Sequence, residues 1–417
     1  MRAKQKQTNW GKTRKLFNDL HLWIGLASGL IIFVICFSGT IYTYNTEIRE
    51  LASPHLHRVE AQTQKKSVDE LISSIQQNHT GTITSISIPN SPTRSYAINV
   101  KPPNDKSRFG VTYFVNPYSG ELLGTSEEKT KTDEFMGYLF SLHRWLLLDK
   151  IEKPIFSSIE NRKLGSYISG AATILFTFGL LTGIVIWFPK KIKNWRQGLT
   201  VKFSSNWKRI NHDLHNSLSL YAFIFLLLMS ITGPQWSFEW YRTGLRKALG
   251  THQEGPKQAK GAKGSRGENS KKGQSKTEEE APVQFLPIEE YLSSASSALT
   301  YPGDYKLSFP KTSDEPIRIS KYKTGFFAPA AADQITLNTQ NASIESVEKF
   351  SDKPFNERVS SSIKALHIGD VYGQFSKLIY FFACLIATSL PVTGTLIWIN
   401  KMKKTKKRPS KEKAVVQ

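Results

Sequence analysis

The chain has 417 residues, with 56 Lys and Arg against 34 Asp and Glu, and only two cysteines. So few cysteines exclude a disulfide framework and a cysteine-ligated zinc or iron–sulfur centre. A net charge of +22 would be consistent with binding to nucleic acid. The positions of the basic residues along the chain therefore have to distinguish nucleic-acid binding from other roles of this charge.

Four apolar stretches are long enough to cross a bilayer, which takes about 20 residues of helix. They are residues 22–44, 167–188, 218–240 and 378–399. The first stretch is too long for a signal peptide and no small-residue cleavage site follows it, so we interpret it as an uncleaved anchor. The sequence therefore predicts an α-helical membrane protein with four transmembrane helices, arranged as two tandem helix pairs.

The basic residues are concentrated in three segments next to these helices. Residues 1–20, 189–216 and 401–417 contain 21 Lys and Arg and only three acidic residues. All three segments fall on one side of a four-helix topology, and the positive-inside rule makes that side the cytoplasm. The charge then reflects topology and contact with the lipid bilayer, and no nucleic-acid-binding motif is present.

These assignments predict a multi-pass protein of the cytoplasmic (inner) membrane with both termini in the cytoplasm. Two long loops would lie outside, and each contains a helical pattern followed by alternating, strand-like runs. Each loop thus predicts a small α+β module, and the polar stretch 251–282 predicts a disordered insert in the second. The remaining predicted boundaries are a basic tail (1–21), the first outer loop (47–164), an inner loop (189–216), the second outer loop (242–372) and a second basic tail (400–417). The expected helices and strands are 67–78, 82–88, 94–101 and 110–116 in the first loop, and 287–299, 304–309, 315–320 and 333–338 in the second.

The two halves of the chain repeat each other. An Asp-Leu-His sequence ends at His21 before the first helix and another ends at His215 before the third. A Leu-His pair ends at His143 before the second helix and another ends at His367 before the fourth. The repeat extends to glycines 18 residues after the first and third histidines, and to the Thr-Gly…Ile-Trp endings of the second and fourth helices, at Gly39, Gly233, Thr182-Gly183 and Thr393-Gly394.

These four histidines are candidate metal ligands. The repeat places His21 and His215 at the cytoplasmic ends of the first and third helices, and His143 and His367 near the outer ends of the second and fourth. Two imidazoles at each face of a helical bundle are the pattern of two bis-histidine haem sites. The alternative for each histidine alone is a polar anchor at the membrane interface, and zinc is a poorer match because it takes more protein ligands.

Other residues support or extend this interpretation. Gly25 and Gly29 lie on the same helical face as His21, where small residues would let a macrocycle pack closely. Arg144 would pair with a haem propionate or extend to the interface. Less defined are His212, the His55-x-His57 pair in the first loop, and aromatic residues that would line a ligand site or a core, among them Tyr96, Tyr113, Phe326 and Phe327.

Taken in order, these motifs resemble the PepSY-associated transmembrane family, iron-regulated inner-membrane proteins that include ferric-siderophore reductases. The stretch 113–121 is similar to the closing hairpin of a PepSY module, whereas residues 337–342 match it less well. The motifs that match are Asp19-Leu20-His21 with Gly25, Leu142-His143-Arg144-Trp145-Leu146, Leu214-His215, Leu366-His367-Ile368-Gly369 and the Thr-Gly…Ile-Trp helix endings.

The resemblance implies four transmembrane helices, two PepSY-like modules outside the cytoplasm and two haems b. The residues that match are His21, His143, His215 and His367, which become haem axial ligands by analogy. Electrons would pass outward to a ferric siderophore or another ferric chelate, in an oxidoreductase of the ferric-siderophore reductase type. The cytoplasmic segments are too short for a nucleotide-binding domain, so a quinol or a cytoplasmic reductase would be the donor.

Two other functions are open to this sequence. The PepSY-like modules on a membrane anchor would suit a non-redox envelope sensor or peptidase regulator. A siderophore permease is the second alternative, although four helices without a buried charge in mid-membrane are a poor substrate path. Haem binding distinguishes the electron carrier from both alternatives.

Overall fold

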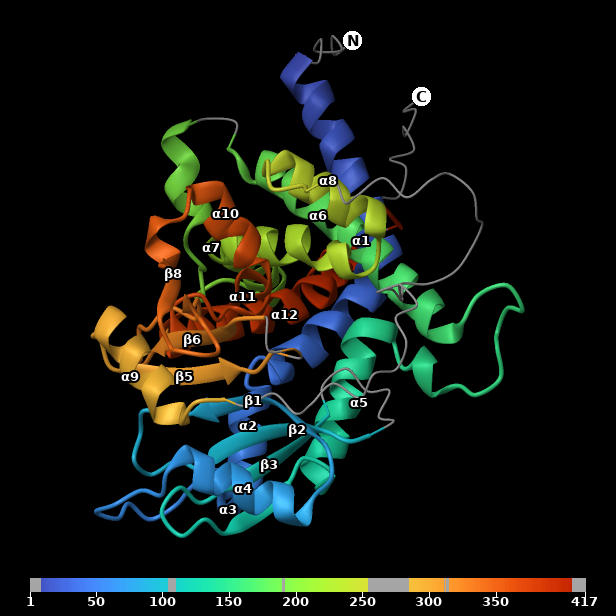
Figure 1. Cartoon of the computed structure of the whole chain (residues 1–417). Helices are drawn as coiled ribbons and strands as arrows, with labels where there is room; N and C mark the ends of the chain where they lie inside the picture. Colours follow the sequence, from blue (N-terminus) through green and yellow to red (C-terminus); the bar gives the residue numbers. More distant parts are fainter. Residues whose placement is uncertain are drawn as a thin grey trace, which may run out of the picture.

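The computed structural model describes residues 9–103, 110–189, 192–253, 285–310, 312 and 315–406. Four long apolar helices and an eight-stranded antiparallel sheet with helices form an α+β membrane protein, and Figure 1 shows the sheet near one end of the helices. The predicted fold class is confirmed. The predicted insert 251–282 lies outside the described residues from residue 254 onward.

The four candidate membrane spans are longer than their apolar runs. They continue as helix into the polar flanks, because a formed helix adds further residues at little cost. In Figure 1, α1 begins far from the sheet and ends beside it. The spans are α1 (Asn9–Tyr42), α6 (Asn161–Trp187), α7 (Trp207–Thr232) and α12 (Gly373–Lys406).

The third span ends as an α-helix earlier than its hydropathy indicates. The apolar run reaches residue 240, but α7 ends at Thr232 and a 3-10 turn, η3 (Gly233–Trp236), follows it. Pro234 is the reason, because a proline has no N–H for the helical ladder and its ring clashes with the preceding turn. A separate amphipathic helix, α8 (Glu239–Ala248), then begins.

The helices and strands expected in the two loops are present within a few residues of their predicted limits. Each module also has a fourth strand that the sequence did not indicate. Strand β4 is only four residues long and β8 is exposed along its whole length, so neither shows a clear apolar alternation. The first module contains α4 (Val68–Asn78), β1 (Thr82–Ile88), β2 (Tyr96–Lys101), β3 (Val111–Val115) and β4 (Leu122–Thr125). The second contains α9 (Ile288–Ala298), β5 (Gly303–Ser308), β6 (Ile317–Lys323), β7 (Asp333–Leu337) and β8 (Ile344–Glu348).

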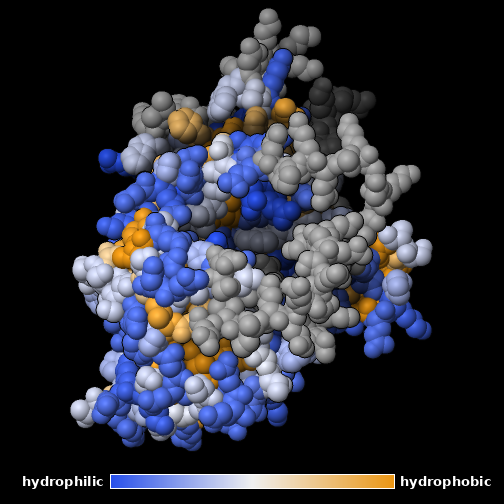
Figure 2. Space-filling model, viewed as in Figure 1, coloured by the Kyte–Doolittle hydropathy of each residue, from blue (hydrophilic) through white to orange (hydrophobic). Residues whose placement is uncertain are grey.

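The two predicted modules share a single sheet. Its strand order is β4-β3-β2-β1-β5-β6-β7-β8, and the antiparallel pairing of β1 with β5 joins the halves, with Ile86 opposite Leu307. Helices α4 and α9 contribute to one continuous core with the strands, in which Leu71 and Tyr291 are fully buried. Figure 2 shows mainly hydrophilic residues over the visible surface of this part of the molecule.

The N-termini of α4 and α9 cap each other. The N–H of Val68 donates to Glu289 Oε1 (2.7 Å), and the N–H of Ile288 donates to Asp69 Oδ2 (2.8 Å). The first N–H groups of a helix have no partner within the helix, and carboxylates are favoured there by the helix dipole. This exchange links the two halves a second time.

Short helices connect the sheet to the spans. Helix α2 is held on three sides by ion pairs that Arg49 makes with Asp133, Glu50 with Arg94, and Glu47 with Lys377. Helices α5 and α12 and the segment that leads into β2 are thereby tied to one element. The connecting helices are α2 (Asn45–Ala52), α3 (Pro54–His57), α5 (Lys131–Trp145), η1 (Leu148–Lys150), η2 (Ile192–Gly198), η4 (Phe350–Asp352), α10 (Phe355–Ser361) and α11 (Ile363–Ile368).

The Arg94–Glu50 pair predicts a pH dependence of stability. Two hydrogen bonds from the Arg94 guanidinium (2.7 and 2.8 Å) lower the pKa of Glu50, because they stabilise the carboxylate. A lowered folded-state pKa contributes stability above the unfolded pKa of about 4.3, and that stability is lost as the pH falls through the folded value. Arg94→Ala should therefore lower the thermal unfolding midpoint of the detergent-solubilised protein at pH 7.

Below the unfolded pKa of about 4.3, the difference between Arg94→Ala and the unchanged protein should shrink progressively as the pH falls through the lowered folded-state pKa of Glu50. Arg318→Ala is the matched control, because Arg318 is exposed and none of the ion pairs between described residues involves it. A difference that stays constant from pH 7 to pH 3 would contradict the ion-pair account.

Candidate functional site

The four predicted histidines form two facing pairs. The ring centres of His21 and His215 are 6.3 Å apart, and those of His143 and His367 are 6.2 Å apart. We call the first the basic-side pair, because it lies towards the Lys/Arg-rich ends of the spans, and the second the sheet-side pair. The structure thus brings together the same partners that the sequence repeat indicated.

The supporting elements differ from the sequence interpretation for one pair. His21 lies on α1 and His215 on α7, as expected. His143 and His367 precede the second and fourth spans, as expected, but they lie on separate helices, α5 and α11, that the sequence interpretation did not include. Residues 146–160 separate α5 from its span and residues 369–372 separate α11 from its span, so the apolar run alone did not reveal a further helix.

For three of the four histidines, the ring atom Nδ1 lies within hydrogen-bond distance of a threonine hydroxyl on a neighbouring span. Nδ1 of His21 is 3.1 Å from Thr182 Oγ1, and Nδ1 of His215 is 2.8 Å from Thr393 Oγ1. On the sheet side, Nδ1 of His367 is 3.0 Å from the hydroxyl of Thr232. Each ring is therefore oriented by a helix other than its own.

Backbone carbonyl groups complete these contacts. Nδ1 of His143 lies 3.0 Å from the carbonyl oxygen of Ile35. The corresponding carbonyls for His21 and His367 belong to Gly179 (3.0 Å) and Met229 (3.1 Å). No hydrogen bond among the described residues involves the Nε2 atom of any of the four histidines.

These partners determine which ring nitrogen carries the proton. The hydroxyls of Thr182, Thr232 and Thr393 each donate their proton to a carbonyl of their own preceding turn, at 2.7–3.0 Å. A hydroxyl has one proton, so it accepts from the histidine, and a carbonyl oxygen can only accept. Nδ1 is therefore the donor in His21, His143 and His367, which each contact a carbonyl oxygen, and their Nε2 atoms keep the lone pair that a metal would use.

A glycine makes room for each ring. A Cβ atom added to Gly39 would lie 3.0 Å from Cε1 of His143, and one added to Gly233 would lie 3.4 Å from Cε1 of His367. A Cβ atom added to Gly183 would lie 3.2 Å from Cε1 of His21, and one added to Gly394 would lie 3.2 Å from Cε1 of His215. Where a backbone carbonyl accepts the hydrogen bond from Nδ1, the glycine lies four residues after that carbonyl. It is then one helical turn further on, on the same face of the helix, so no side chain covers the carbonyl oxygen.

The sequence contained a signal for these pockets that its interpretation missed. Thr182-Gly183 and Thr393-Gly394 were used only as markers of the repeat. Gly39 and Gly233 are also preceded by a hydroxyl residue, Ser38 and Thr232, so each of the four spans carries one Ser/Thr-Gly pair at a histidine. In three of these pairs the threonine hydroxyl beside the glycine contacts the histidine, whereas the Ser38 hydroxyl donates to carbonyl groups of its own helix.

The basic-side pair lines a cavity of about 300 Å³ between the spans. Gly25 and Gly29 line the same cavity, as their spacing from His21 indicated. Nothing lies within 4 Å of a Cβ placed on Gly25, and the nearest atom to one on Gly29 is Pro391 Cβ at 3.6 Å. The cavity is also lined by His212 and Ser219.

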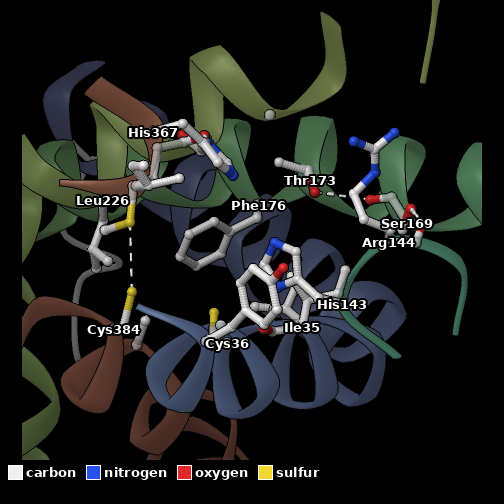
Figure 3. Close-up of a pocket in the computed structure, with 18 of the residues that line it drawn as sticks. Ile35, Cys36, His143, Arg144, Ser169, Thr173, Phe176, Leu226, His367 and Cys384 are labelled. Atoms are coloured by element: carbon white, nitrogen blue, oxygen red, sulfur yellow. Dashed lines mark hydrogen bonds between the residues drawn. The ribbon is translucent and has the colours of Figure 1, made fainter. Parts of the chain in front are cut away.

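The sheet-side pair lines a second cavity, of about 140 Å³ (Figure 3). His143 and His367 face it from different elements, with Phe176 at its wall. Burial lowers the pKa of His367 to about 3 and also lowers that of His143, so both rings are neutral at physiological pH. Arg144 is the cationic residue in its lining, and its Nη2 atom is 3.5 Å from the carbonyl oxygen of Trp236.

With this geometry in place, a comparison with protein families identifies the group to which the chain is related. The family described as PepSY-associated TM region matches residues 19–401. The chain belongs to this family. No curated protein matches the chain. The matched range includes all four histidines and the four glycines beside them.

Other candidates in this PepSY-associated TM protein do not join the two pairs. His55 is exposed on α3, and the ring of His57 packs 4.9 Å from that of Phe114. Tyr96 and Tyr113 are buried in the core of the sheet and line neither of the two cavities. Within the part of the chain that the structure describes, no group of three or more His, Cys, Asp or Glu side chains is arranged for a metal ion.

In this PepSY-associated TM protein, replacing a glycine by alanine should have opposite effects on stability at Gly39 and at Gly25. Gly39→Ala places a methyl group 3.0 Å from the His143 ring and displaces its Nδ1 from Ile35, which costs about 1–3 kcal/mol for an unsatisfied buried group. Gly25→Ala meets nothing within 4 Å and should be neutral or stabilising by up to about 1 kcal/mol, because alanine favours helix.

Thermal unfolding of the two variants, prepared in one detergent with both cavities empty, checks this. The midpoint should fall for Gly39→Ala and stay level or rise for Gly25→Ala. Equal shifts in both variants would mean that the space beside Gly39 is not required by the histidine.

Proposed function

We propose that this PepSY-associated TM protein is a haem-containing transmembrane electron-transfer protein that reduces a ferric siderophore, or another ferric chelate, outside the cytoplasm. The observation that carries the proposal is the pair of facing imidazoles in each of two cavities, every ring held through Nδ1. His21 and His215 are the proposed axial ligands of one haem, and His143 and His367 those of the other.

The spacing of the rings fits a metal between them. Two imidazoles bound end-on to one ion, each about 2 Å from it as in histidine–zinc bonds, have ring centres roughly 6 Å apart. The observed separations are 6.3 and 6.2 Å. A bare zinc ion needs three or four protein ligands, whereas an iron porphyrin brings four of its own and leaves two axial positions for histidine.

The surroundings of the rings also fit such a group. Hydrogen bonds from Nδ1 to a carbonyl or hydroxyl fix the orientation of a ligating imidazole and raise the basicity of Nε2. The cavity walls are largely apolar, with glycines where a flat ring would approach a helix. Arg144 supplies a positive charge at the sheet-side cavity, where it would pair with a propionate. When bound, haem supplies one-electron redox chemistry at a potential tuned by these contacts.

The direction of transfer follows from the charge on the spans. The Lys/Arg-rich segments place their side of the bilayer in the cytoplasm by the positive-inside rule, so both termini would be cytoplasmic and the sheet would lie outside. A quinol or a cytoplasmic reductase is the proposed donor. Each ferric ion takes one electron and becomes Fe(II), which hard oxygen ligands hold less tightly, so that the chelate releases its iron.

The first test is a visible absorption spectrum of the detergent-purified protein before and after dithionite. We expect a Soret band with sharp α and β bands on reduction, and close to two haems per chain by pyridine haemochrome, because each pair supplies two axial nitrogens. A ferric chelate that is a substrate should then reoxidise the reduced protein. A colourless protein from haem-replete cells would contradict the proposal and favour an envelope sensor.

Single substitutions test the assignment of the pairs. His21→Ala and His143→Ala should each remove about half of the haem, since each variant deprives one of two sites of an axial ligand. His55→Ala, at an exposed histidine outside both cavities, is the control and should keep full content. Full haem content in either cavity variant would show that the pairing is wrong.

A further inference from the structure

The loop between β6 and β7 exposes two adjacent aromatic rings. Phe326 and Phe327 lie at its tip, and 53% and 64% of their surfaces remain exposed. Their ring centres are 5.0 Å apart. Large apolar side chains that stay open in a well-formed loop usually mark a surface for another molecule.

This loop is fastened to the start of a membrane span. The N–H of Phe375, in the first turn of α12, donates to the carbonyl oxygen of Phe326 (3.2 Å), and the ring of Phe327 lies 5.0 Å from that of Phe375. Gly373 has a φ of +54°, and a Cβ there would lie 3.1 Å from the carbonyl oxygens of Phe326 and Ala328. A residue with a side chain would push the loop off the helix, so the contact depends on this glycine.

The two rings continue the apolar outer surface of α12. Three, seven and ten residues after Phe375 along α12 come Leu378, Phe382 and Leu385, and 43–53% of the surface of each is exposed. That spacing puts them on one side of the helix. A stripe of exposed apolar residues on a span of the membrane faces lipid, and Phe326 and Phe327 extend it beyond the first turn of the helix.

We propose that the β6–β7 loop inserts Phe326 and Phe327 into the headgroup boundary of the bilayer, on the sheet side. Lipid is the occupant favoured by the continuity with the lipid-facing stripe of α12. Lys323, at the end of β6, is exposed beside the loop, and its Nζ atom lies 5.1 Å from the ring centre of Tyr301. The anchor fixes the height of the sheet above the membrane, independently of whether the cavities hold haem.

The test places a fluorophore at the loop tip of the full chain in lipid nanodiscs. Phe327→Cys is labelled in a background of Cys36→Ala and Cys384→Ala, and Gln77→Cys, exposed on α4, serves as the control position. We expect doxyl-labelled phospholipid to quench position 327 several-fold more than position 77, and aqueous iodide to show the reverse preference.

Quenching of position 327 by iodide as strongly as position 77 would overturn the proposal, because the loop would then be in water. Protection from iodide without quenching by the doxyl lipid would overturn it as well, and would indicate that a second copy or another protein covers the rings.

A second set of variants separates insertion from folding. With the label on Thr324→Cys, which is exposed next to the tip, the pair Phe326→Ser and Phe327→Ser should increase iodide quenching several-fold. The pair Phe326→Leu and Phe327→Leu should retain protection, because leucine restores the apolar surface without the rings. Equal iodide quenching in the serine and leucine pairs would contradict an anchoring role for these side chains.

Discussion

A histidine ring inside an apolar helical bundle must find a hydrogen-bond acceptor for its N–H, because no water is present to replace one. Helix carbonyls are already bonded within the helix, but each has a second lone pair. That lone pair is accessible from a neighbouring helix only where the overlying residue has no side chain. Gly39 provides this opening over Ile35, and Gly233 provides it over Met229. The arrangement of the site depends on this constraint, since it sets how closely the helices approach and which nitrogen faces the cavity.

The joined sheet explains why the histidines meet in pairs. Each half of the chain alone would present one histidine at either face of the bundle. Pairing of β1 with β5, together with the reciprocal caps at Asp69 and Glu289, holds the two halves in a fixed relation. His143 and His367, which belong to different halves and sit on separate helices, are therefore opposed across one cavity. A connection through flexible loops would not hold their ring centres at one separation.

Much of this architecture was predictable from the sequence, because hydropathy reports the spans and spacing reports the repeat. The pairing of His21 with His215 followed from their equivalent positions before the first and third apolar runs, which the structure places within α1 and α7. The edge strands were missed because they are short or exposed, and the joined sheet because pairing between residues about 220 positions apart leaves no local pattern. The polar partner Thr232 was also missed, since a hydroxyl residue inside an apolar run is usually bonded only to its own helix, as Ser38 is here.

The repeat makes the four histidine pockets alike, but it does not make the two cavities alike. Arg144 follows His143, whereas Ile368 occupies the corresponding place after His367, so the sheet-side cavity is cationic on one half and apolar on the other. Ile32 and Phe176 line both cavities, and together they form the wall that the cavities share. An anionic group in the sheet-side cavity thus has one favoured side. The residue after each histidine therefore differs between the halves while the surroundings of the rings are kept, and this difference would orient an anionic group in an otherwise symmetric scaffold.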